Sequence, residues 1–171
     1  MFKEAVERFT QYENVYAAMY ADGVQTIARI MYKPDTKMEV RGGIFGTPYF
    51  MLFTPTGVFL DHEMQTRHLS SSEDNPSLGF LLDPRVIAKG VIPESEREEV
   101  GELWIAEYDI RNLGLNPEDM LHIRQVSTGF KRSFEFTTLD GLLGQMTHQG
   151  ISLEHQDISL IFNYHSSTDL D

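Results

Sequence analysis

The chain has 171 residues, a formal net charge of −12 and no cysteine. This length is sufficient for one domain with a buried core. The lack of cysteine excludes disulfides, thiolate nucleophiles and cysteine-ligated metals. Hydrophobic residues make up 41% of the chain and aromatic residues 11%, which excludes a disordered polymer. We therefore expect a single domain over residues 1–171.

The acidic residues are concentrated in two segments. Residues 91–120 hold nine acidic side chains against Arg97 and Arg111, a net charge of −7, and residues 151–171 hold four with no lysine or arginine. A nucleic-acid backbone or an anionic membrane needs a basic surface, so neither is an expected partner. The acidic segments would suit a basic surface on another protein, although solubility alone also explains them.

The first residues, MFKEAVERF, carry four charged side chains and so lack the apolar region of a signal peptide. No run of about eighteen apolar residues occurs that would cross a membrane. From these patterns we expect a protein that is not exported by a signal peptide and works in the cytoplasm or in a particle assembled there.

The first predicted element is a long helix over residues 2–20. Its apolar residues recur at intervals of three or four, as on one face of a helix, and include Phe2, Val6, Phe9, Tyr16 and Tyr20. Asp22-Gly23 is predicted to end it in a turn, because glycine adopts a positive φ without strain.

A β-rich body is predicted to follow over about residues 23–165. Alternating or continuous apolar patterns predict strands at 24–32, 38–40, 102–110, 120–126, 132–136 and 157–165. Residues 49–60 predict a hairpin, with Pro55 and Gly57 at its turn, whose two-sided apolar strands should be central. The last residues, 166–171, read as a short acidic tail.

Three further segments have mixed signals. Residues 79–92 contain two apolar runs divided by Asp83-Pro84 and are predicted to be short strands. Ser95-x-x-Glu98 and Thr137-x-x-Asp140 have the spacing of capping boxes and predict brief helices. The total is about seven to nine strands with two or three helices. This pattern predicts an α+β fold, mostly antiparallel β in a barrel- or sandwich-like sheet, with an N-terminal helix.

A candidate metal site lies in LDHEMQTRHLSSSED, where four possible ligands occur within eight residues: Asp61, His62, Glu63 and His68. A strand would send His62 to the face opposite Asp61 and Glu63, which separates the ligands. The histidine spacing also differs from the His-Glu-x-x-His zinc motif. The pattern therefore favours the solvent end of a strand over a metal site, and no cofactor is expected.

A candidate catalytic pair comes from two His-x-Ser tripeptides, which begin at His68 and His165. Two such tripeptides on separate strands can hold a phosphate, with the histidines as acid and base. This makes a small phosphoesterase one alternative, provided that the two side chains face each other across a pocket. No Gly-x-Ser-x-Gly elbow marks a serine nucleophile, so we expect no enzyme.

Three stretches, ARIMYKPDTKMEVRGGIFGTPYF, LGLNPEDMLHI and FKRSFEF, resemble parts of small virion proteins of tailed bacteriophages. The virion proteins that these stretches resemble are the head–tail connector, adaptor and neck components. The resemblance implies a non-enzymatic structural protein that assembles into a ring as a homo-oligomer, located in the virion or in the infected cell. It brings no catalytic residues with it.

The leading hypothesis is thus a virion connector or neck-type component that acts through protein–protein contacts. Its interface is predicted from the N-terminal helix and the acidic segment: Phe2, Phe9, Tyr16, Glu94, Glu96, Glu98 and Glu99. The alternative is an acidic inhibitor or decoy that covers a basic surface of a host or defence protein. The phosphoesterase with His68 and His165 is a second alternative.

Overall fold

The computed structural model describes residues 1–34, 37–44, 47–54, 57–62, 65–69, 82–114, 130–148 and 157–165. Of residues 28 and 165, and of the described residues between 41 and 69, only the backbone is described. The predicted strand at 120–126 and the tail at 166–171 lie outside these ranges. In the described part of the chain, no helix is both long enough and apolar enough to cross a membrane.

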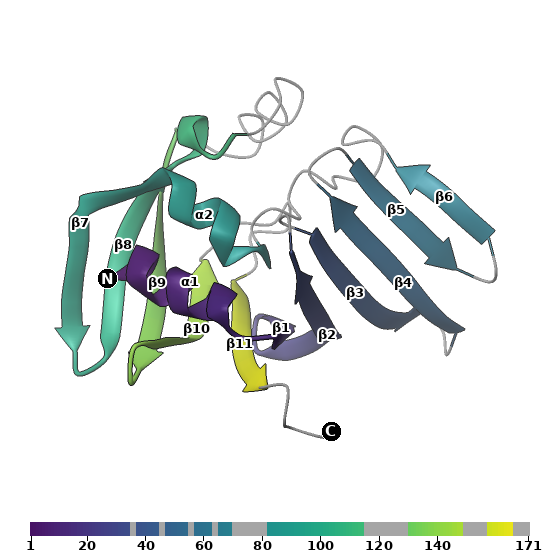
Figure 1. Ribbon diagram of the computed structural model, residues 1–171, viewed down its shortest axis with the longest axis horizontal. Helices are drawn as coiled ribbons and strands as arrows, with labels where there is room; N and C mark the ends of the chain where they lie inside the picture. Colours follow the sequence, from purple (N-terminus) through teal and green to yellow (C-terminus); the bar gives the residue numbers. More distant parts are fainter. Residues whose placement is uncertain are drawn as a thin grey trace.

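Eleven strands of the described chain form one open antiparallel sheet (Figure 1). They are β1 Asn14–Ala21, β2 Val24–Lys33, β3 Lys37–Ile44, β4 Thr47–Thr54, β5 Gly57–His62, β6 Gln65–Leu69, β7 Val91–Val100, β8 Leu103–Asp109, β9 Lys131–Leu139, β10 Leu142–His148 and β11 Ile158–His165. Their order is β6-β5-β4-β3-β2-β1-β11-β10-β9-β8-β7, so β6 and β7 are the edges. Two helices, α1 Phe2–Gln11 and α2 Pro84–Gly90, and a 3₁₀ turn, η2 Ile110–Asn112, complete it. The α+β, mostly antiparallel fold is confirmed.

The predicted helix over 2–20 is correct only to Gln11, and its second half is strand β1. The spacing of Tyr12, Tyr16, Met19 and Tyr20 is compatible with both periods, so the pattern alone did not separate them. Strand β1 pairs with β2 on one side and with β11 on the other, and Val15 and Ala17 alternate into the core. These ladder hydrogen bonds come from segments distant in sequence, which local spacing does not report.

Two Asp-Gly pairs make tight hairpin turns. Asp22 and Gly23 have φ values of 48° and 82° between β1 and β2, and Asp140 and Gly141 have 53° and 81° between β9 and β10. Positive φ at both central residues matches the right-handed twist of hairpin strands. The second turn shows why the helix expected from Thr137-x-x-Asp140 is wrong.

The other two mixed segments are also corrected. Ser95-x-x-Glu98 lies in strand β7 and not in a helix, whereas the apolar run after Asp83-Pro84 is helix α2 and not a strand. Asp83 caps α2 by accepting a hydrogen bond from the Arg85 backbone N–H at 2.9 Å, and Pro84 occupies the first turn. Proline there loses no helical hydrogen bond, so the pair that appeared to break a strand begins a helix.

The expected hairpin at 49–60 is present as β4 and β5, with Phe53 opposite Val58. Its expected central position is wrong, because β5 is next to the edge strand β6. The strands at 24–32, 38–40, 102–110, 132–136 and 157–165 are confirmed as β2, β3, β8, β9 and β11.

The core lies on one face of the sheet, under the two helices. In Figure 1, α1 and α2 lie over the half of the sheet that contains β8–β11, while β3–β6 extend away from them. Phe2 on α1 makes edge-to-face contacts with Phe134 and Phe136 on β9, both at 5.0 Å between ring centroids. Phe9, two turns later, contacts Tyr32 on β2 at 4.9 Å and Phe162 on β11 at 5.8 Å. Helix α1 therefore bridges strands from both halves of the sheet.

Helix α2 is held to the β2–β3 hairpin and to η2. The Tyr32 hydroxyl donates to the Leu82 carbonyl at 2.6 Å, and the Arg85 guanidinium donates to the carbonyls of Lys33 and Lys37. At the other end of α2, a Cβ on Gly90 would lie 2.6 Å from the Asp109 carbonyl oxygen. Only glycine permits this close approach.

Replacement of Phe2 by alanine tests the bridging role of α1. Phe2 is fully buried, so the cavity should lower the free energy of unfolding by roughly 3–5 kcal/mol, measured by urea denaturation. Val100→Ala is the control, since Val100 is largely exposed on β7 and its loss should change stability by less than about 0.5 kcal/mol. Equal effects of the two changes would contradict the packing described for α1.

Candidate functional site

The residues predicted to bind a metal lie at one edge of the sheet. Asp61 and His62 end β5, and the register pairs them with Thr66 and Gln65 on β6. His68 is opposite Phe59, so it belongs to the face of Asp61, and His62 belongs to the other face. Glu63 lies outside the described residues, as do the side chains of the other three. Among the residues that are described, no group of three acidic or histidine side chains could hold a metal.

The two histidines of the expected phosphoesterase are on different parts of the sheet. His68 is on the edge strand β6 and His165 ends β11, with five strands between them. At about 4.8 Å per strand, this corresponds to roughly 29 Å along the sheet. The strand order alone therefore does not bring the pair together, and the directions of both side chains lie outside the described residues.

The aromatic residues expected at an interface lie in two environments. Phe2 and Phe9 are in the core, 0% and 2% exposed. Tyr16 lies on the other face of β1, with the Arg29 guanidinium carbon 4.2 Å from its ring centroid. The helical spacing that suggested Phe2 and Phe9 as contacts thus reports the burial of α1 against its own sheet.

The four acidic residues of the predicted interface all lie on the edge strand β7. Glu94, Glu98 and Glu99 are exposed, and Arg97 pairs with Glu99 at 2.6 Å. Charged side chains on an edge strand oppose pairing with another sheet. This position is compatible with solubility and with an outside partner alike.

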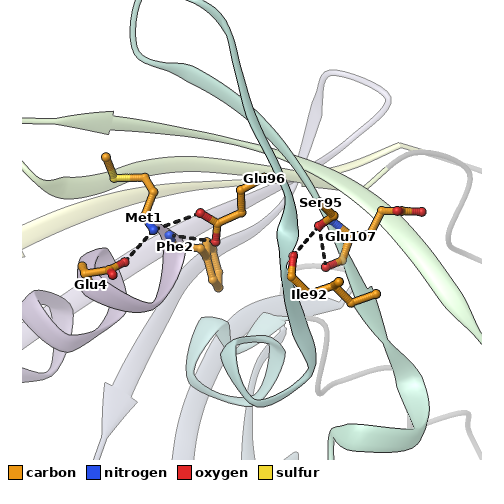
Figure 2. Close-up of polar contacts among 7 residues, drawn as sticks. All are labelled: Met1, Phe2, Glu4, Ile92, Ser95, Glu96 and Glu107. Carbon is orange, nitrogen blue, oxygen red and sulfur yellow. Dashed lines mark hydrogen bonds and ion pairs between the residues drawn. The ribbon is translucent and has the colours of Figure 1, made fainter.

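Glu96 differs from these three because it faces α1 (Figure 2). Its carboxylate accepts hydrogen bonds from the Met1 amino group at 2.9 Å and from the Phe2 backbone N–H at 3.3 Å. The side chain is only 11% exposed. An anion at the start of a helix accepts hydrogen bonds from the free N–H groups there and interacts favourably with the positive end of the helix dipole. Sequence reasoning selected Glu96 for a contact but could not identify its partner, 94 residues away.

Ser95 explains the irregular path of β7. Its hydroxyl donates to the Ile92 carbonyl at 2.6 Å and accepts from the Glu107 backbone N–H at 2.8 Å (Figure 2). The β7–β8 register shifts between Ile92 and Arg97, so the hydroxyl replaces missing ladder bonds. The bulge turns the next residue, Glu96, toward α1.

The core face of the sheet continues beyond the helices by register. Met38 and Val40 on β3 are buried on this face, and they pair with Phe53 and Met51 on β4. These positions in turn pair with Val58 and Leu60 on β5. Since paired residues share a face, one row of apolar positions runs from β3 to β5.

At the other end of the core, a polar group interrupts the apolar face. Tyr108 on β8 is opposite Arg132 on β9, and the His148 ring on β10 lies 5.6 Å from the Tyr108 ring. Tyr108 and His148 are 0% and 1% exposed. Within the described chain, Tyr108 Oη, Arg132 Nε and His148 Nε2 are buried without a hydrogen-bond partner. Each such atom costs about 1–3 kcal/mol.

Burial determines the protonation of this group. Burial, with a smaller contribution from the Arg132 charge, lowers the pKa of His148 to about 3. Burial also raises the pKa of the Tyr108 hydroxyl. At neutral pH the group therefore consists of one cation and two neutral polar side chains. Met146 and His148, two residues apart, have the alternating spacing of a strand, but the Thr137-x-x-Asp140 spacing favours a helix for the same segment.

One shallow pocket of about 500 Å³ lies on the outer side of α1. It is lined by Glu4, Glu7, Arg8, Gln11, Tyr12 and Leu142. Arg8 also donates to the Asp140 carbonyl at 3.2 Å, which ties α1 to the β9–β10 turn. The lining is the solvated face of the helix, and it combines no acid, base and nucleophile.

Comparison with solved structures shows which fold this is. The chain is similar to the lipoprotein LppX of Mycobacterium tuberculosis, with a TM-score of 0.53 and 9% identity over 99% of this chain and 95% of that one. LprF of Mycobacterium bovis also matches, with a TM-score of 0.49 and 9% identity over 99% and 92% of the two chains. No family model and no curated protein matches this sequence.

This comparison corrects the resemblance to tailed-phage virion proteins, and with it the connector function and the virion location. The fold is similar to that of LppX over almost the whole chain. One of the resembling stretches covers β2–β4, another lies on β9, and the third is mostly outside the described residues. Short alternating strands with turn residues occur in any antiparallel sheet. The three stretches therefore do not distinguish virion proteins from other proteins with such a sheet.

The contact between Glu96 and α1 can be tested by Glu96→Gln. Loss of the charge should lower the free energy of unfolding by about 1 kcal/mol, because a hydrogen-bonded and largely buried anion is removed. Glu98→Gln on the same strand is the matched control and should change stability by less than about 0.5 kcal/mol. Similar losses in urea denaturation of both variants would rule out a specific anchor.

Burial of neutral His148 predicts a pH dependence of stability. Below its ordinary pKa of 6.5 the histidine gains a proton when unfolded but not when folded, until about pH 3. The free energy of unfolding should therefore fall by about 1.4 kcal/mol per pH unit from pH 6 to pH 4, in excess of the fall in His148→Phe. Carboxylates titrate in both proteins, so the difference isolates His148. Parallel stability curves would show that His148 is not buried and neutral.

Proposed function

We propose that this chain is a non-enzymatic binding protein that holds an apolar ligand, such as an acyl chain, on the core face of its open sheet. The observation that carries the proposal is the mismatch between this face and its helical cover. In the described part of the chain, eleven strands form the sheet, whereas the two α-helices have ten and seven residues. No catalytic residue is part of the proposal.

Simple dimensions show the size of the mismatch. At about 4.8 Å between strands and about 3.3 Å per residue, the face measures more than about 1,000 Å². Two helices with a combined length of about 25 Å and a width of about 10 Å cover roughly 250 Å². The helices lie over the β8–β11 half in Figure 1. Apolar surface on the rest of the face would gain free energy by contact with apolar material instead of water.

The apolar row on β3, β4 and β5 supports a ligand on that part of the sheet. Met38 and Val40 at its β3 end are already buried, and the row continues at Met51, Phe53, Val58 and Leu60 on β4 and β5. Methionine and phenylalanine adapt to irregular apolar shapes, which suits a flexible chain. A sheet whose strands are already hydrogen-bonded to one another can hold such a ligand without rearrangement of its backbone. A carrier of this kind is needed where an apolar molecule must pass through water, so we place the protein in an aqueous compartment.

Binding can be measured by displacement of an environment-sensitive fluorescent dye with palmitate. Leu60→Asn places an amide on the apolar row and should weaken palmitate binding by about ten-fold, since an unpaired amide costs about 1–3 kcal/mol. Leu52→Asn is the matched control, because Leu52 pairs with Glu39 and so belongs to the opposite face. No saturable displacement by the original chain, or equal losses in both variants, would overturn the proposal.

A further inference from the structure

We propose that Tyr108, Arg132 and His148 form a binding site for an anionic oxygen group, a carboxylate or a phosphate. The three side chains come from β8, β9 and β10, which are adjacent in the sheet. Tyr108 and Arg132 are register partners, and the Tyr108 and His148 rings are 5.6 Å apart. This site is separate from the apolar row on β3–β5, so it can exist without the ligand proposed for that row.

One polar atom of each of the three residues lacks a hydrogen-bond partner in the described chain. Within the described chain, Tyr108 Oη, Arg132 Nε and His148 Nε2 are all buried and have no hydrogen-bond partner. Buried polar atoms in proteins are nearly always satisfied, and three unsatisfied atoms on adjacent strands require a common explanation. A group that enters between them would satisfy all three.

The chemistry of the atoms selects an acceptor. Arginine Nε–H can only donate, and a tyrosine hydroxyl and a neutral imidazole can each donate as well. Carboxylate and phosphate oxygens accept several hydrogen bonds at once. An amine or an amide N–H would leave Arg132 without a partner. The site is therefore suited to an oxygen acceptor.

Charge distinguishes an anion from an ordered water. Arg85, Arg97 and Arg111 each pair with a carboxylate two residues away. Arg132 has no ion pair with any described carboxylate, although its Nε is buried. Neutral His148 adds no charge, so the three side chains together carry one positive charge, which favours an anion over a neutral water molecule. A singly charged anion compensates it.

The packing around the site orients the two buried rings. His148 stacks on Phe134 at 5.7 Å with an interplanar angle of 22°, and Tyr108 packs against the same ring at 5.6 Å. Both rings thus pack against one apolar neighbour, which limits the side-chain freedom that binding would remove. Arg132 is only partly buried, so its guanidinium connects the buried pair with solvent.

The test uses three probes on the full chain: inorganic phosphate, palmitate and palmityl alcohol. Binding is followed by calorimetry and by the NMR signals of the His148 ring, which are assigned by their loss in His148→Phe. We expect phosphate or palmitate to shift the His148 signals. Palmityl alcohol, which lacks the anion, should leave them in place and bind at least about ten-fold more weakly than palmitate if the head group is the natural source.

Two variants remove the proposed contacts. Tyr108→Phe deletes one hydroxyl without a change of shape, and Arg132→Gln deletes the charge. Each should weaken binding of the anionic probe by about ten-fold or more, while Arg97→Gln, on the exposed part of β7, should leave it unchanged. Tyr108→Phe removes an unpaired buried hydroxyl and should fold normally, so it tests the site even if Arg132→Gln does not fold.

The outcomes distinguish a failure of the anion site from a failure of the proposed apolar ligand site. A His148 shift with phosphate alone supports a site for a free anion, and a shift with palmitate alone supports a head-group site. Equal binding of palmitate and palmityl alcohol, unaffected by Tyr108→Phe but lost in Leu60→Asn, would overturn the anion site and leave the apolar site standing. Absence of any His148 shift with both anions would also overturn it.

Discussion

The structure depends on covering one apolar face of an open sheet. The described strands satisfy their backbone hydrogen bonds with their neighbours, but their side chains leave a continuous apolar layer on one side. Helix α1 meets this requirement with Phe2 and Phe9, which contact strands of both halves of the sheet. A short helix is marginal in water, so this packing stabilises α1 as much as it covers the sheet. The polar contacts of Glu96 and Arg8 at its two ends then determine where α1 lies.

The same constraint links the two sites. In the described chain the two short helices do not extend over β4 and β5, where the apolar row continues and where we propose that a non-polar ligand is buried. The cluster of Tyr108, Arg132 and His148 has the opposite character, since its polar atoms are buried without partners. One end of the face thus favours apolar material and the other favours an acceptor with a negative charge. The similarity to LppX concerns the fold, and the chemistry of each site follows from the residues of this chain.

Local patterns predicted most strands but failed where two structures share a pattern. Residues 14–20 satisfied the helical spacing, yet they belong to β1 because β2 and β11 supply its hydrogen bonds on both sides. Thr137-x-x-Asp140 has the spacing of a helix cap, but the positive φ at Asp140 and Gly141 produces a hairpin. The Asp83-Pro84 pair appeared to interrupt a strand and instead begins α2. In each case a competing local signal was present, and contacts with distant segments selected between them.

The candidate site was less predictable than the fold. Glu96 and Phe2 are 94 residues apart, and no local signal connects them. Tyr108, Arg132 and His148 are each ordinary in their own strands and become a group only when β8, β9 and β10 are adjacent. By itself the sequence determined the acidic charge, the absence of cysteine chemistry and the α+β class, because these follow from composition and short-range periodicity. Tertiary structure alone decided the strand order, the role of α1 as a cover and the grouping of buried polar atoms, because these depend on contacts between residues far apart in the chain.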